Sequence, residues 1–79
     1  MHIKVLGPGC KNCTTLEANV REALSRLGRD AQIEKVSDYA AIMGHGVMST
    51  PGLVIDGEVV SYGRVPTPAQ IQEMISNAS

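Results

Sequence analysis

The chain has 79 residues, carries seven Lys and Arg against eight Asp and Glu, and has a formal net charge of −1. Apolar residues make up 43 % of it, which suffices for one hydrophobic core, and the length predicts a single domain over residues 1–79. The near-neutral charge and the 3 % aromatic content argue against nucleic-acid binding. Because the sequence contains neither a signal-like segment nor an apolar run long enough to cross a bilayer, we expect a cytoplasmic protein without a membrane partner.

The first half of the chain predicts a strand, a long helix and a second strand. Residues 2–6 are rich in β-branched side chains, and the Gly-Pro-Gly of residues 7–9 ends this strand. From near residue 10 to residue 27, apolar side chains recur at a spacing of three and four, which is typical of one helix face, and Gly28 ends the helix. Residues 31–36 form a second strand. The short link between helix and strand favours a β-α-β unit with parallel strands and a right-handed crossover.

The middle of the chain predicts a short helix and a hairpin. Ser37-Asp38 offers an N-cap for a helix through about Met43. Residues 52–55 form an apolar strand, Asp56-Gly57 is a strong hairpin-turn signal, and residues 58–62 return as the partner strand.

The end of the chain predicts a third helix. Thr67 is an N-cap residue and Pro68 suits the first helical position. The helix would bury Ile71 and Ile75, together with Met74. The element order is therefore β-α-β-α-β-β-α, which defines an α/β fold class. Three methionines lie on apolar stretches and are also expected in the core: Met43, Met48 and Met74.

The two cysteines form a C-x-x-C motif, Cys10-Lys11-Asn12-Cys13, where the first strand gives way to the helix. The unpaired backbone N–H groups and the dipole of a helix N-terminus stabilise a thiolate at Cys10, and Lys11 adds a positive charge beside it. Cys13 lies one turn further along and can attack a mixed disulfide formed at Cys10. Two thiols so spaced can transfer two electrons and close an intramolecular disulfide.

The motif also has interpretations other than redox chemistry. A purely structural disulfide would close a loop of four residues, which stabilises by only about 2 kcal/mol, and the cytosol tends to reduce such bonds. Paired thiolates also bind Cu(I) or Zn, so a metal carrier is the alternative function. The chain offers no second C-x-x-C, and its other candidate ligands are His2, His45 and four methionines. A third hypothesis is an interaction domain with inert cysteines.

The arrangement resembles the thioredoxin/glutaredoxin superfamily, and most closely its small microbial glutaredoxin-like thioredoxins. Residues 7–13, residues 47–51 before the Asp56-Gly57 hairpin, and residues 62–66 carry the likeness, which extends over essentially the whole chain. It implies a thioredoxin-like fold, with a four-stranded mixed sheet flanked by three helices. It also implies a monomeric thiol–disulfide oxidoreductase that needs no metal and no cofactor beyond its own redox-active disulfide.

The resemblance assigns roles within the motif. Cys10 corresponds to the nucleophile and Cys13 to the resolving thiol, while Lys11 and Asn12 are expected to support the thiolate. Lys11-Asn12 replaces the dipeptide of typical thioredoxins, and the preceding strand lacks the buried carboxylate that larger members use.

The resemblance also implies a substrate site outside the motif. Pro51 matches the cis-proline that faces the cysteine pair, and Thr50 would pair through its backbone with a strand of a disulfide-containing protein. Gly63 corresponds to the glycine that lines the substrate groove. Residues 63–66 lack the second glycine and the acid with which glutaredoxins bind glutathione. We therefore expect an electron donor of the thioredoxin reductase type.

Overall fold

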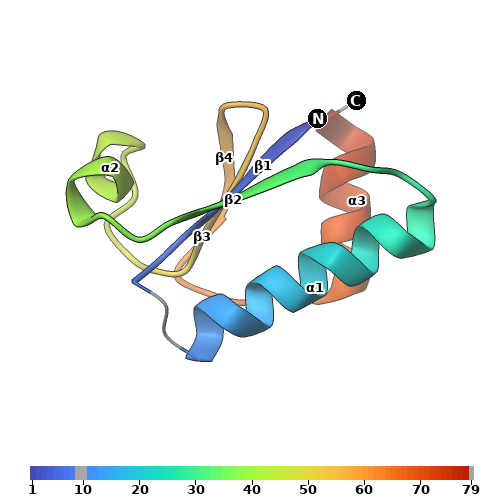
Figure 1. Ribbon diagram of the computed structural model, residues 1–79, viewed down its shortest axis with the longest axis horizontal. Coiled ribbons are helices and arrows are strands. Elements are labelled where there is room, and N and C mark those ends of the chain that lie inside the picture. The colour runs from blue at the N-terminus through green and yellow to red at the C-terminus, as the bar shows by residue number, and fades with distance from the viewer. Residues whose placement is uncertain (9–10, 79) are drawn as a thin grey trace.

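The computed structural model describes residues 1–8 and 11–78, over which four strands form one mixed sheet with three helices packed on it (Figure 1). The elements in chain order are β1 (His2–Leu6), α1 (Lys11–Leu27), β2 (Gln32–Val36), α2 (Tyr39–Gly44), β3 (Gly52–Ile55), β4 (Glu58–Tyr62) and α3 (Pro68–Ala78). The order predicted from the sequence is confirmed, and so is the α/β class.

The sheet has the strand order β2-β1-β3-β4. β1 pairs with β2 in parallel, as the short link after the long helix predicted, and with β3 in antiparallel orientation. β3 and β4 form the expected hairpin. Its turn residues Asp56 and Gly57 both have positive φ, 49° and 87°, which is the backbone of a type I′ turn. Because β1 and β3 are antiparallel neighbours and Leu6 lies opposite Gly52, the segment that follows β1 lies beside the loop that precedes β3.

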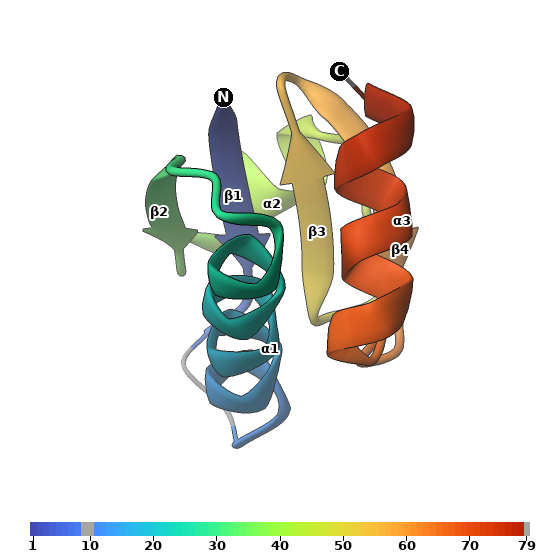
Figure 2. The same cartoon turned by 90° about the vertical axis from the view of Figure 1, so that its right-hand side faces the viewer.

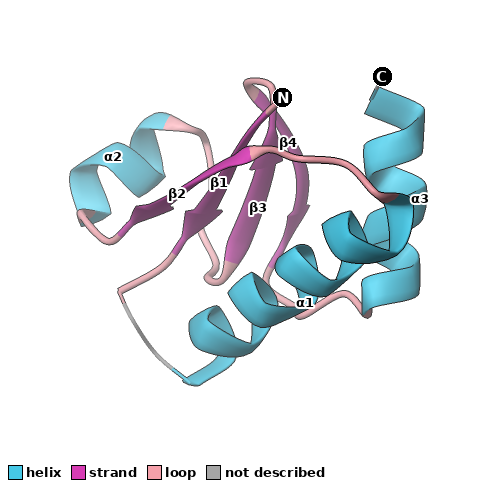
Figure 3. Ribbon diagram, turned by 45° about the vertical axis from the view of Figure 1, so that its right-hand side comes forward, coloured by secondary structure: helices cyan, strands magenta, loops and turns pink. Residues whose placement is uncertain are grey.

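Helices α1 and α3 cover one face of the sheet, and α2 covers the other (Figures 2 and 3). The larger core lies beneath α1 and α3 and consists of ten buried residues: Ile3, Val5, Leu16, Val20, Ala23, Leu24, Leu53, Ile55, Ile71 and Ile75. The smaller core lies beneath α2 and consists of Leu6, Ile42, Val47 and Val54. Each fully buried aliphatic side chain stabilises the fold by about 1.5–3 kcal/mol before entropy is counted.

The first helix has the amphipathic pattern that the sequence predicted. Its buried face faces the sheet, while ion pairs at the i,i+4 spacing lie outside, with Glu17 2.8 Å from Arg21 and Glu22 2.7 Å from Arg26. Gly28 follows the helix with φ of +64°, a conformation that favours glycine and that ends the helix.

The third helix begins with a reciprocal cap. The Gln70 N–H donates to the Thr67 hydroxyl at 3.2 Å, and the Thr67 N–H donates to the Gln70 side-chain carbonyl at 3.0 Å. Ile71 and Ile75 are fully buried and Met74 packs at the edge of the larger core, so the apolar face predicted for this helix is confirmed.

Two of the three methionines that we expected in the core are on the surface. Met43 and Met48 are mostly exposed, so that part of the prediction was wrong. The reason is the shortness of α2, which has six residues and buries one of them, Ile42. Such a short helix and the loop after it cannot bury every one of their apolar side chains against the sheet. None of the helices in the described ranges is both long and apolar enough to cross a membrane.

Candidate active site

Cys13 is the third residue of α1 and is almost fully buried, with 4 % of its surface exposed. Cys10, the expected nucleophile, lies outside the described residues and directly precedes the first residue of α1 in the sequence. Cys13 is therefore held in the first turn of a 17-residue helix, at the end where backbone N–H groups lack intrahelical partners.

Gly7 brings Cys13 and Pro51 together. A Cβ placed on Gly7 would overlap the Cys13 sulfur and would lie 4.0 Å from the Pro51 Cα. The Gly7 N–H donates to the Val36 carbonyl at 2.8 Å, which fixes the chain as it leaves β1. From the sequence, Gly7 was expected to end a strand and belonged to the segment that carries the resemblance, but it had no assigned role in the site. Its proximity to both the Cys13 sulfur and Pro51, a residue more than forty positions away, has no local signal in the sequence.

The substrate-site residues suggested by the resemblance also lie together. The Thr50–Pro51 peptide bond is cis, as expected, and Pro51 is buried. The Gly63 N–H donates to the Pro51 carbonyl at 2.9 Å. Gly63 has φ of +74°, and a Cβ there would lie 3.2 Å from the Cβ of Ser49, so both the backbone and the packing favour glycine at this position.

The two residues between the cysteines are exposed. Lys11 and Asn12 are the first residues of α1, and the Thr15 hydroxyl donates to the Lys11 carbonyl at 3.0 Å within that first turn. The start of the helix thus carries an exposed lysine within the motif. The expected support of a thiolate by Lys11 and Asn12 stays a prediction.

Among the candidate metal ligands, His2 lies far along β1 from the start of α1 and contacts Glu34. Within residues 1–8 and 11–78, no group of three or more His, Cys, Asp and Glu side chains could hold a metal ion. His2 lies at the opposite end of β1 from Gly7, and its imidazole is 3.1 Å from Glu34. The histidine therefore serves a contact between β1 and β2.

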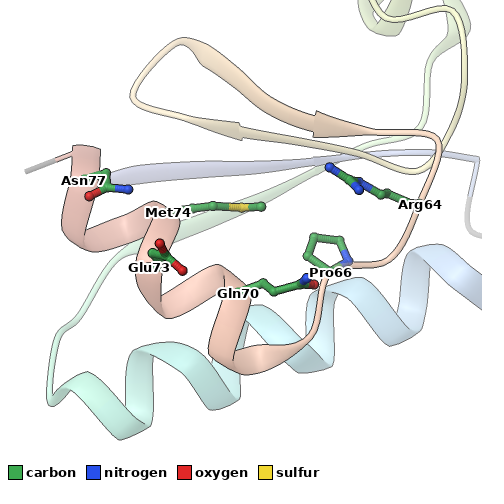
Figure 4. A pocket seen from close by; sticks show the side chains of 6 residues that line it. All are labelled: Arg64, Pro66, Gln70, Glu73, Met74 and Asn77. Atoms are coloured by element: carbon green, nitrogen blue, oxygen red, sulfur yellow. The ribbon is translucent and has the colours of Figure 1, made fainter.

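Two surface pockets lie near the ends of these loops. One, of about 280 Å³, is lined by Thr50 and by residues of α2 and the loop that follows it. The other, of about 240 Å³, lies between α3 and the loop after β4, where the side chains of Arg64 and Met74 extend toward each other (Figure 4). Its lining also includes Glu73, a carboxylate, so the pocket presents both charges. Neither Gly7, Cys13 nor Pro51 belongs to its lining.

Comparisons with known proteins agree over nearly the whole chain. Residues 1–76 match the family model described as a thioredoxin domain. A thioredoxin of Methanothermobacter thermautotrophicus is 42 % identical over 76 residues, which cover 96 % of this chain and 99 % of the relative. A thioredoxin of Methanocaldococcus jannaschii is 36 % identical over 75 residues, which cover 95 % of this chain and 86 % of that relative. The metal-carrier alternative gains no support from these comparisons.

Proposed function

Because this chain belongs to the thioredoxin family and is a thiol–disulfide oxidoreductase, we propose that Cys10 attacks the disulfide of a partner protein and that Cys13 then releases the product. The observation that carries this proposal is the contact around Gly7, where the Cys13 sulfur and Pro51 approach the same point. One thiol is thereby held inside the fold, next to the loop that is expected to bind substrate.

The reaction is a pair of exchanges in which sulfur atoms alone change bonds. The Cys10 thiolate attacks one sulfur of the partner disulfide, a mixed disulfide forms, and the other partner sulfur leaves as a thiolate. The Cys13 thiolate then attacks the Cys10 sulfur, which closes the Cys10–Cys13 disulfide and expels the second partner thiolate. The partner gains two electrons and two protons. The cysteine pair loses both and is reduced again by a donor of the thioredoxin reductase type.

Burial gives Cys13 a role distinct from that of the nucleophile. A thiol with 4 % exposure cannot meet a partner disulfide directly, but it can attack a sulfur of the residue three positions earlier in the sequence. The N-terminal end of α1 favours the thiolate that this second step requires. We therefore assign Cys13 as the resolving thiol and Cys10 as the attacking one.

The loop before β3 supplies the binding contact. The Pro51 carbonyl already accepts the N–H of Gly63, so the backbone pairing with an extended partner segment falls to Thr50. Pro51 and Gly63 shape the wall against which that segment lies. Lys11 and Asn12, in solvent at the start of α1, face the approaching disulfide and favour the thiolate over the thiol.

Trapping of the mixed disulfide tests the assignment. A Cys13→Ser variant, mixed with a disulfide-containing protein such as insulin, is expected to accumulate a covalent adduct that mass spectrometry locates at Cys10. The matched Cys10→Ser variant should form none, because its remaining thiol is buried. An adduct at Cys13, or no adduct in either variant while the wild type reduces insulin, would refute the assigned roles.

A further inference from the structure

Arg64 differs from the other arginines of the chain in its contacts. Arg21 and Arg26 form i,i+4 ion pairs with glutamates, and Arg29 is also engaged. Arg64 is exposed and, within the part of the chain that the structure describes, takes part in no hydrogen bond or ion pair. Its guanidinium is therefore free to meet a group from outside the molecule.

Arg64 lines the 240 Å³ cavity between α3 and the loop after β4, which we call the Arg64 pocket (Figure 4). The described residues that line it are Arg64, Pro66, Gln70, Glu73, Met74 and Asn77. Its floor is apolar, because Pro66 is buried and Met74 packs against the larger core. Its rim is polar and exposed, and it carries one cation and one anion.

The two charges of the Arg64 pocket do not neutralise each other. Among the described residues, no ion pair joins Arg64 to Glu73, and Glu73 forms none elsewhere. In Figure 4 the guanidinium extends toward Met74 along the cavity. A guanidinium can hold a carboxylate through two parallel hydrogen bonds, which a lysine cannot do. The pocket therefore offers an unused site for a carboxylate.

The Arg64 pocket adjoins the proposed substrate site. Arg64 directly follows Gly63, whose N–H donates to the Pro51 carbonyl at 2.9 Å. Pro51 in turn lies beside the position at Gly7 where a side chain would meet the Cys13 sulfur. An extended segment advances about 3.3 Å per residue. A partner segment that lies against Pro51 and Gly63 therefore comes within reach of Arg64 after a few more residues.

We propose that the Arg64 pocket binds a carboxylate side chain of the protein whose disulfide this chain exchanges. The inference rests on the proposed function and adds a partner class to it: proteins that carry an Asp or Glu a few residues from the disulfide. Arg64 is then a specificity-determining residue, while the sulfur chemistry proceeds at the cysteine pair. Because Glu73 repels a second carboxylate, the pocket prefers a single acid to an acidic run.

Size and charge favour this occupant over others. Sites for small organic ligands run from about 300 to 1,000 Å³, so a cavity of 240 Å³ suits one side chain better. The polar lining residues are exposed, so an entering carboxylate keeps part of its hydration. The formal net charge of the chain is −1, so the molecule as a whole does not attract an acidic partner. The attraction is therefore local to Arg64.

A series of disulfide peptides tests the inference. All share one intramolecular disulfide, and each carries a single Glu about two to five residues away on either side, the reach of an extended segment. Each has a counterpart with Gln at that position. We measure kcat/KM and divide it by the rate constant of the same peptide with free dithiothreitol, which removes differences in intrinsic reactivity. The wild type is expected to prefer Glu about two- to fivefold at one position, the size of an exposed ion pair. Equal values at every position would overturn the inference.

Substitutions of arginines assign the preference to the pocket. Arg64→Gln removes the cation, so the preference is expected to fall close to one, and folding is secure because Arg64 is exposed. Arg64→Lys keeps the charge and should retain part of the preference. Arg26→Gln is the matched control, since it changes the net charge equally in the last turn of α1 and should leave the preference intact. A preference that survives in Arg64→Gln would place the recognition at another cation, such as Lys11.

Glu73→Gln tests the part assigned to the anion of the pocket. A peptide with two adjacent Glu is expected to react no faster than the best single-Glu peptide with the wild type. With Glu73→Gln it should react faster than the single-Glu peptide, because the repulsion is gone. The same ranking of the two peptides with both proteins would refute the role of Glu73.

The outcomes separate this inference from the function on which it rests. If the wild type reduces none of the peptides, the proposed function fails. If it reduces all of them alike, only the Arg64 pocket fails. The preference should also shrink as salt is raised to about 1 M, where the Debye length is about 3 Å, and a preference independent of salt would contradict an ionic contact. A dimer that Arg64→Gln dissociates, seen by sedimentation, would show instead that the pocket joins two copies of the chain.

Discussion

A single glycine lies between the buried thiol and the cis-proline loop. Gly7 follows β1, and its φ does not require glycine; the space does. A methyl group at this position would overlap the Cys13 sulfur and would come within 3.2 Å of the Cys13 Cβ. The resolving thiol therefore occupies the volume that a side chain would fill at residue 7, so the identity of residue 7 and the position of the thiol are coupled.

The Gly7→Ala substitution is expected to lower the free energy of unfolding by about 1–3 kcal/mol, the usual cost of overpacking. It should also change the rate at which a buried thiol reacts with an alkylating reagent in the Cys10→Ser background, because Cys13 must move. Urea denaturation and alkylation followed by mass spectrometry measure the two effects.

Gly44→Ala is the control for that substitution. Among the described residues, no atom beyond the immediate neighbours lies within 4 Å of a Cβ at Gly44, which ends α2. Alanine there should leave stability unchanged or raise it by up to about 1 kcal/mol through its higher helix propensity. If Gly7→Ala and Gly44→Ala have the same stability and thiol reactivity, the space at Gly7 does not constrain Cys13.

At the scale of elements, one carboxylate joins the first helix to the edge of the sheet. Glu17 on α1 accepts hydrogen bonds from Arg21 of the same helix at 2.8 Å and forms an ion pair at 3.1 Å with Lys35 of β2. Its side chain is partly buried, with 16 % of its surface exposed. The hydrogen bond from Arg21, followed by that from Lys35, holds the pKa of Glu17 below its ordinary value of 4.5.

Glu17→Gln is expected to destabilise the protein by about 0.5–1 kcal/mol at pH 7. A carboxyl whose pKa is lower in the folded than in the unfolded state stabilises the fold above its ordinary pKa and loses that contribution as the pH falls through the folded value. The difference between wild type and variant should therefore shrink below pH 4.5. Urea titrations at several pH values measure it. Glu22→Gln removes an i,i+4 pair without a link to β2 and should cost less. A difference independent of pH would contradict the ionic account.

The two N-caps suggested by the sequence differ in the structure. Thr67 and Gln70 form a reciprocal cap at α3, whereas the side chain of Asp38, within the described residues, makes no capping hydrogen bond at α2. Thr67→Ala is therefore expected to cost about 1 kcal/mol of stability and Asp38→Ala clearly less. Thermal unfolding monitored by circular dichroism compares them. A larger loss for Asp38→Ala would mean that α2 depends on its cap after all.

Local signals explain how much of these elements was predictable. The period of the apolar residues in α1 and the Asp56-Gly57 turn each depend on residues close together in the sequence. The strands, helices and hairpin could therefore be predicted from the sequence. The exposure of Met43 and Met48 does not, because a short apolar stretch has no period that tells its inner from its outer face. The order of strands around β1 and β3 likewise depends on contacts distant in the sequence.

At the scale of the whole molecule, the site is built where four segments meet. Each segment contributes one residue: Gly7 follows β1, Cys13 lies at the start of α1, Pro51 lies in the loop before β3, and Gly63 follows β4. The sequence motifs and the resemblance suggested three of these four. Gly7 was missed because its importance lies in the volume that Cys13 fills. The 280 Å³ pocket beside Thr50 lies next to Pro51 and extends toward α2.

The redox equilibrium of the cysteine pair tests the central claim most directly. The protein is equilibrated with graded ratios of reduced and oxidised dithiothreitol, alkylated, and examined by mass spectrometry. We predict that Cys10 and Cys13 lose and gain alkylation together, along a two-electron curve in which a tenfold change in the ratio of oxidised to reduced protein corresponds to about 30 mV. Independent titration of the two thiols, or disulfides that join two chains instead, would contradict a function based on the Cys10–Cys13 pair.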